Sequence, residues 1–239
     1  MRLRQPTGGY AVEEVSVLRQ EAVVDVELVA AGHLMRVENR RLIQVARGYD
    51  LIYNSEMTRE ERRHIEEDLI KAAAKFIGGN RAHLQSPTNW SAIGTCSILI
   101  SGVATDDDDL IKLGLFGRNR GRSENKWWEG NPNPNPQGVE LHFSERAIRE
   151  DGLWTEGAMG YQFMALQALV ADAEILWHRG IDLYRYRDGA LKKLFDSPLQ
   201  YAYPDLRTPA INDSGHGSIV GREAYLYEFA YRRYRDPKY

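Results

Sequence analysis

Hydrophobic residues recur every three or four positions along most of this chain, which is the spacing of one face of an α-helix. A capping box at Thr58 and Glu61 marks one helix start, and glycines follow several of the periodic stretches. No segment shows a persuasive strand pattern. We therefore predict an all-α fold of antiparallel helical hairpins. The expected helices cover about 12–31, 34–53, 58–79, 90–103, 110–116, 140–149, 157–178, 188–195 and 222–234.

Size and charge narrow the class of protein. The 239 residues, 43% of them hydrophobic, are sufficient for a single helical region over 1–239 with a real core. The net charge of −3 gives no overall positive field, so an acidic ligand must be held by a local cluster of residues. The single cysteine, Cys96, excludes an internal disulfide framework.

The chain has no stretch that reaches the roughly 18–20 apolar residues of a membrane span, so we expect no membrane partner. Residues 1–10 are polar and basic, and they lack the apolar core of a signal peptide. We therefore expect either a cytoplasmic protein or a chain without its natural start.

The segment 117–138 breaks the helical pattern. Proline occupies alternate positions over 131–136, which forbids a helix and predicts an ordered loop. Basic and aromatic side chains before these prolines could pair with acidic groups and stack on sugar rings. They could equally contact phosphates and bases of nucleic acid, or form a solvated loop with its tryptophans in the core. The residues concerned are Arg118, Arg120, Arg122, Lys126, Trp127 and Trp128.

The segment 150–163 is the richest in chemical groups, because it places acids and Tyr161 around an expected helix start. A helix start carries free N–H groups and partial positive charge, which predicts a lowered pKa for Tyr161. Gly157 and Gly160 are expected to leave room for a bulky ligand beside the backbone. The structural alternative is that Tyr161 packs at the helix start while Glu156 caps that helix.

Two further positions are candidates for chemistry. Asn89 precedes Trp90 at a predicted helix start, where an asparagine is commonly an N-cap. Alternatively, its amide donates to a substrate carboxylate and Trp90 offers a ring for sugar stacking. His216 lies in a polar turn and could serve as a base, although a loop histidine is often a bystander. The acidic run 106–109 is expected to begin a helix, and we expect no metal site.

Four segments, in consistent order over roughly 49–239, resemble one group of enzymes. They are similar to the heparinase II/III-like and related alginate lyase families, whose signature is Asp-Gly, Glu-Gly and then Tyr. The segments are 151–157 followed by Tyr161, the Asn89-Trp90 helix start, 209–214 and 227–231.

This resemblance implies an incomplete (α/α) toroid that cleaves acidic polysaccharides by β-elimination. In that reaction the C5 proton of a uronic acid is removed and the 4-linked sugar leaves. The matching positions imply that Asn89 neutralises the substrate carboxylate and that Tyr161 delivers or removes the proton. His216 is a candidate partner base, and Glu156 is expected to orient the assembly. No cofactor is implied, and the family implies a periplasmic or extracellular location.

Beyond these catalytic positions, the resemblance and the basic loop imply a sugar cleft for an acidic polysaccharide or oligosaccharide, and not for nucleic acid. Trp90 and Gln162 stand where many relatives have histidine. Relatives also have a C-terminal β-sandwich, which we do not expect here. The alternatives are a non-catalytic carbohydrate-binding module, a truncated inactive lyase, or a scaffold that binds protein or nucleic acid through the basic loop. The expected substrate-binding residues are Trp90, Arg118, Arg120, Arg122, Trp127, Trp128, Trp154, Glu156 and Gln162.

Overall fold

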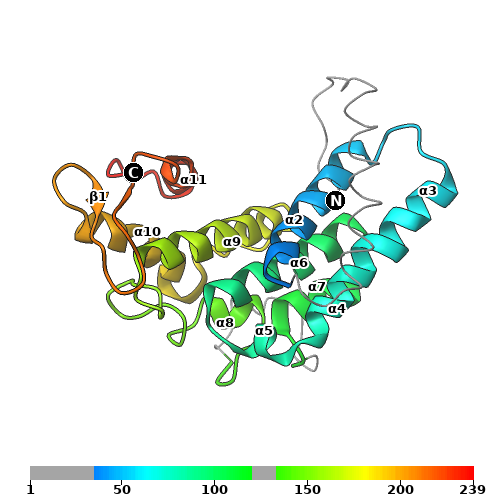
Figure 1. Cartoon of the computed structure of the whole chain (residues 1–239), viewed down its shortest axis with the longest axis horizontal. Helices are drawn as coiled ribbons and strands as arrows, with labels where there is room; N and C mark the ends of the chain where they lie inside the picture. Colours follow the sequence, from blue (N-terminus) through cyan, green and yellow to red (C-terminus); the bar gives the residue numbers. More distant parts are fainter. Residues whose placement is uncertain (1–34, 120–132) are drawn as a thin grey trace.

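The protein is mainly helical, as predicted (Figure 1). The computed structural model describes residues 35–119 and 133–239, so the helix expected over 12–31 lies outside the described residues. None of the described helices is both long and apolar enough to cross a membrane. The helical elements are α2 (Met35–Ile52), α3 (Arg59–Arg63), the π-helical segment η1 (His64–Lys71), α4 (Ala72–Gly79), α5 (Arg81–Gln85), α6 (Asn89–Ala104), α7 (Asp108–Phe116), α8 (Val139–His142), α9 (Met159–Trp177), α10 (Tyr186–Tyr201) and α11 (Ala224–Tyr234).

The segments α3, η1 and α4 follow one another without a break. They begin at the predicted capping box. The Thr58 hydroxyl accepts from the Glu61 N–H at 3.2 Å, and the Glu61 carboxylate accepts from the Thr58 N–H at 2.9 Å. Buried positions such as Ile70 and Ala74 form the face that packs on α2 and α6. The run ends at Gly79, where the glycine pair predicts a stop.

The α6–α7 pair is an antiparallel hairpin with unusually close backbones. A Cβ atom on Gly114 would lie 2.9 Å from the Cα of Leu99, and one on Gly102 would lie 2.6 Å from the Ile111 nitrogen. Only glycine fits such an approach, so these two glycines allow the close packing of α6 on α7. At the turn, the Asp107 carboxylate accepts from the Leu110 N–H at 3.0 Å, so the acidic run begins α7 as expected.

Two further hairpins flank this pair. α2 is followed by α3, and the Arg62 guanidinium donates to the Tyr53 carbonyl at 3.0 Å across the turn. α9 is followed by α10, and the Gln162 amide near the start of α9 donates to the Ser197 hydroxyl at 2.6 Å in the last turns of α10. Helical hairpins are therefore the building unit of the described residues, as predicted.

The first helices of the hairpins run in the same direction. Asn89 contacts Met164 near the starts of α6 and α9, and two turns later Cys96 and Asp172 interact electrostatically. Asp172 is fully buried, and burial raises its pKa to about 8. α6 thus lies in the middle of the molecule, packed against α2, α7 and α9 (Figure 1).

α2 and α6 are parallel as well. Near the start of both helices, the Arg40 guanidinium lies 5.4 Å from the centre of the Trp90 ring. Further along both helices, the charge of Arg47 acts on Cys96. α2, α6 and α9 therefore form three neighbouring parallel helices, each with a returning partner.

Three local predictions were wrong or incomplete. The helix expected over 140–149 ends at His142, and the chain then turns so that Ile148 bridges Trp154. α10 is longer than predicted, although Arg187–Gly189 depart from helical geometry and Pro198 lies inside it. A short antiparallel pair, which the sequence pattern did not predict, joins β1 (Arg207–Thr208) and β2 (Gly217–Ser218).

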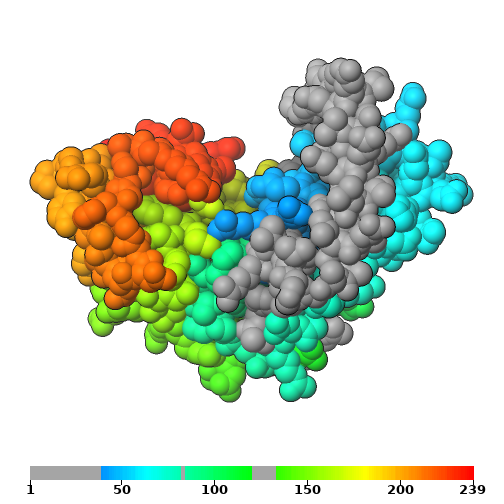
Figure 2. All heavy atoms as spheres, viewed as in Figure 1, coloured from blue at the N-terminus to red at the C-terminus, as the bar shows by residue number. Residues whose placement is uncertain are grey.

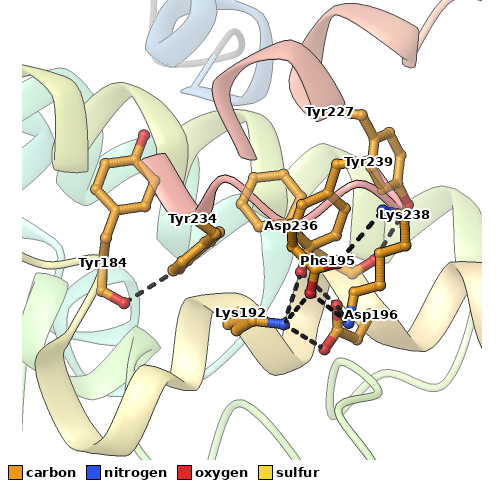
Figure 3. A network of polar contacts seen from close by, with 9 residues as sticks. All are labelled: Tyr184, Lys192, Phe195, Asp196, Tyr227, Tyr234, Asp236, Lys238 and Tyr239. Atoms are coloured by element: carbon orange, nitrogen blue, oxygen red, sulfur yellow. Dashed lines mark hydrogen bonds and ion pairs between the residues drawn. The ribbon is translucent and has the colours of Figure 1, made fainter. Parts of the chain in front are cut away.

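Ion pairs and aromatic rings hold the C-terminal residues onto α10 (Figure 3). Lys192 Nζ lies 3.2 Å from the carboxylates of both Asp196 and Asp236. Lys238 Nζ lies 2.9 Å from the Asp196 carboxylate, to which the Tyr239 hydroxyl also donates. Because each carboxylate has a cationic partner, this region is a charge-balanced anchor for α11.

Candidate active site

Glu156 joins two helix starts that lie far apart in the sequence. Its carboxylate accepts from the backbone N–H of Asn89 at 2.5 Å and from the indole N–H of Trp154 at 2.8 Å. The first N–H groups of a helix have no partner within it, and the positive end of the helix favours a carboxylate. Glu156 therefore caps α6. The alternative in which it caps α9 is wrong, since the first turn of that helix donates instead from the Gly160 N–H to the Ser214 hydroxyl.

The side chain of Asn89 is buried but poorly satisfied. It is 1% exposed, and among the described residues its amide Nδ2 donates only to the Met164 thioether, at 3.6 Å. Its Oδ1 atom has no hydrogen-bond partner among the described residues. A buried polar atom without a partner destabilises a fold by about 1–3 kcal/mol. Because packing does not explain such an unpaired polar atom, it is a candidate for a functional role.

Tyr161 lies in the first turn of α9 and is half-buried. Its hydroxyl donates to the Asp213 carboxylate. This hydrogen bond, with smaller contributions from desolvation and the negative charges of Asp213 and Glu156, raises the pKa of Tyr161. The lowered pKa that the helix start predicts is therefore wrong, because nearby carboxylates outweigh the partial charge of the helix.

The segment that carries Asp213 rests on the start of α9. The Asn212 amide donates to the Gly157 carbonyl at 3.0 Å, and the Ser214 hydroxyl accepts from the Gly160 N–H at 3.0 Å. Figure 2 shows this orange segment on the surface, over the yellow-green residues that precede and begin α9. A Cβ on Gly157, which has a φ of +71°, would lie 2.6 Å from Asn212 Nδ2. The room at these glycines therefore accommodates the segment, which corrects the expectation of space for a ligand.

Trp154 and Gln162 support the site from inside the fold. Trp154 is fully buried and Gln162 is 1% exposed. The Gln162 side chain accepts from the Trp154 N–H at 3.1 Å and donates to the Ser197 hydroxyl at 2.6 Å. Neither side chain has surface for a sugar in this structure, which corrects the expected substrate contacts. Both fix the turn that presents Glu156.

A buried histidine lies beneath the start of α6. His142 is within 3.2 Å of the Ser91 and Thr95 hydroxyls, and burial lowers its pKa to about 4. It is therefore neutral near pH 7 and supports the helix that carries Asn89. Among the described residues there is no cluster of three or more groups that could hold a metal ion.

A comparison with protein families shows which family the chain belongs to. A model of the alginate lyase family matches residues 29–208, which is most of the chain. The chain belongs to the alginate lyase family. No curated protein gives a significant match to it.

The alginate lyase match includes Asn89, Glu156 and Tyr161 and ends before Asp213. The sequence did not single out Asp213 as a functional residue. Its segment, 209–214, resembled the family, but that resemblance does not reveal a partner 52 positions earlier.

The other predicted residues lie at further positions of the described chain or outside it. Trp90 is half-buried beneath Arg40. Arg118 is exposed, and its guanidinium donates to the Gly79 carbonyl at 3.2 Å. His216 is exposed, and its Nδ1 donates to the Thr208 carbonyl at 3.1 Å. The predicted residues outside the described part of the chain are Arg120, Arg122, Trp127 and Trp128.

Proposed function

We propose that this protein is a polysaccharide lyase that cleaves polymers of uronic acids by β-elimination. The observation that carries the proposal is the link through Glu156, which holds Asn89 at the start of α6 beside the turn that leads to Tyr161. Membership of the alginate lyase family supports the reaction class and an acidic polysaccharide substrate.

Each residue has a distinct task in this reaction. The C5 proton of a uronic acid can be removed only if the adjacent carboxylate is neutralised, and the amide of Asn89 is the proposed donor. Tyr161 takes the C5 proton and supplies a proton to the departing 4-oxygen. Glu156 holds both helix starts in place and does not take part in the proton transfer. His216 remains a candidate base on the neighbouring segment.

Substrate access to Asn89 requires a side-chain movement. Met164 is half-buried, and its sulfur accepts the hydrogen bond that the Asn89 amide donates among the described residues. A methionine is flexible, and a thioether is a weak acceptor. We propose that the substrate carboxylate replaces the Met164 sulfur as the acceptor of the Asn89 amide.

The helix arrangement supports an incomplete (α/α) toroid. Three parallel helices, α2, α6 and α9, each have a returning partner, as the inner layer of such an arc requires. We propose that the sugar chain lies along the end of this layer where α6 and α9 begin. Trp90 and the basic residues from Arg118 onward would line the approach.

The low exposure of Asn89 favours one alternative. If Met164 does not move, the same surface could bind sugars without cleaving them, and the protein would be a carbohydrate-binding module.

A substrate panel tests both functions. The purified chain is incubated with alginate, heparin, heparan sulfate and chondroitin, and the absorbance of the unsaturated product is followed. We expect product from at least one polymer and none from the Tyr161→Phe variant. Binding without product in the wild type would support the carbohydrate-binding module and overturn the lyase.

A further inference from the structure

Asp213 has the contact expected of a proton acceptor for Tyr161. Its carboxylate accepts the only hydrogen bond that the Tyr161 hydroxyl makes among the described residues. The bonds of Asn212 and Ser214 to the start of α9 fix the backbone on both sides of Asp213. Three hydrogen bonds, made by Asn212, Asp213 and Ser214, therefore fix the position of the Asp213 carboxylate.

No cation balances this carboxylate within the described residues. The salt bridges formed there do not include Asp213. The other charged group that acts on the Tyr161 phenol is Glu156, which is also acidic. Among the described residues, two carboxylates and no ion-pairing cation therefore act on the Tyr161 hydroxyl.

The hydrogen bond poses a question for a reaction in which Tyr161 is the base. The phenol carries its own proton, and the raised pKa of Tyr161 keeps it there near neutral pH. A neutral phenol can accept the C5 proton only if its own proton leaves at the same time. The group positioned to receive it is Asp213.

We propose that Tyr161 and Asp213 form a proton relay for the elimination, an inference that rests on the proposed lyase function. The C5–H bond breaks and its proton goes to the Tyr161 oxygen, while the Tyr161 proton goes to Asp213. The C5 electron pair forms the C4–C5 double bond as the C4–O4 bond breaks. Tyr161 then protonates the departing O4 and recovers its proton from Asp213, so both residues end unchanged.

Asp213 is a positioning and relay residue in this scheme, because it reaches the sugar only through Tyr161. The Asp213→Asn variant keeps an oxygen for the hydrogen bond but cannot take up the proton. We therefore expect kcat at neutral pH to fall roughly 100-fold, with little change in KM. Activity should recover as the pH rises toward the pKa of Tyr161, since a phenolate needs no relay.

The experiment measures kcat and KM against pH on the polymer that the wild type cleaves best. Asp213→Glu should retain part of the activity and the wild-type pH profile. Asp205→Asn is the matched control, because it makes the same change at another exposed carboxylate, whose partner is Arg207 and not Tyr161. Its pH profile should stay that of the wild type. A second measurement is the titration of Tyr161 by NMR with labelled tyrosine, in which Asp213→Asn should lower the pKa.

The outcomes separate the two proposals. If Tyr161→Phe is inactive but Asp213→Asn keeps the wild-type kcat and pH profile, the relay is wrong and the lyase stands. An unchanged Tyr161 titration in Asp213→Asn would also overturn the relay. If the wild type yields no product from any polymer, the lyase function fails and the relay fails with it.

Discussion

Near each end of α9, a tyrosine hydroxyl donates to a carboxylate, but the surroundings of the two pairs differ. At the start, Tyr161 donates to the exposed Asp213, for which the described residues provide no cation. At the other end, Tyr184 donates to Glu174 at 2.6 Å. Two nitrogens of Arg233 also lie 2.8 and 2.6 Å from the Glu174 carboxylate.

The two tyrosine–carboxylate pairs differ in whether a cation balances the carboxylate. Burial alone would raise the pKa of Glu174, but hydrogen bonds from Arg233 and Tyr184 outweigh it and lower that pKa. This carboxylate therefore stays ionised and holds the end of α9 to α11. In the part of the chain that the structure describes, the Tyr161 pair has no comparable cation, and its proton is the one that the proposed relay moves. The same two groups are thus structural at one end and suited to chemistry at the other.

Replacing the two tyrosines separately gives the strongest test of this contrast. Tyr161→Phe should lower kcat about 1,000-fold because it removes the acid and base, with almost no change in stability. Tyr184→Phe should leave kcat intact and destabilise the fold by about 1.5 kcal/mol, since a bond to a charged acceptor is lost. Product absorbance and urea unfolding measure both effects. Equal losses of activity in the two variants would contradict the division.

The next largest effect is expected when Arg233, the cation that pairs with Glu174, is replaced. Arg233→Met leaves Glu174 without its ionic partner, and both side chains are mostly buried, at 9% and 18% exposure. We expect a loss of about 3 kcal/mol in unfolding free energy. Adding Glu174→Gln should recover part of that loss, because no uncompensated charge remains. If Arg233→Met alone were as stable as the wild type, the Arg233–Glu174 pair would contribute little to the unfolding free energy.

Asp172 lies between the two ends of α9, and its burial predicts that the stability of the fold depends on pH. Its pKa of about 8 in the folded protein exceeds its ordinary value of 3.8, so the folded state holds its proton longer than the unfolded chain does. Stability should therefore fall as pH rises between these values, by up to about 1.4 kcal/mol per pH unit. Asp172→Asn should remove this contribution. Parallel unfolding curves of both proteins from pH 5 to pH 7 would contradict it.

The smallest expected change in stability comes from removing the Trp177 ring that packs against Arg233. The guanidinium lies 4.1 Å from the centre of the Trp177 ring, which is 42% exposed. Trp177→Leu keeps an apolar side chain but removes the ring face. We expect a loss of about 0.5–1 kcal/mol, measured by urea unfolding at low and high salt. A larger loss in the Arg233→Met background than in the wild type would argue against the cation–ring contact.

Much of the helical fold was accessible from the sequence because its signals are local. The capping box at Thr58 fixed one helix start, and apolar spacing located α2, α6 and α9. The interrupted α10 was not predictable in the same way. Its residues Arg187–Gly189 take left-handed backbone angles, which no apolar pattern reveals, and Pro198 argues against a helix that packing nevertheless maintains.

The site was only partly predictable, because its contacts join residues distant in the sequence. Resemblance to the family brought Asn89, Glu156 and Tyr161 into one hypothesis, and the structure links Glu156 to Asn89 directly. The burial of Trp154 could not be read from a motif. The contact between Asp213 and Tyr161 depends on how the segment before β2 folds back onto α9, which local spacing does not specify.

The unpaired carbonyl of Asn89 has a consequence for protein engineering. An apolar residue of similar volume would remove a buried, unsatisfied group, so a screen for heat resistance alone should accept or even favour it. A screen for sugar cleavage should reject the same change. Laboratory evolution under the two pressures would therefore diverge at this one position before most others.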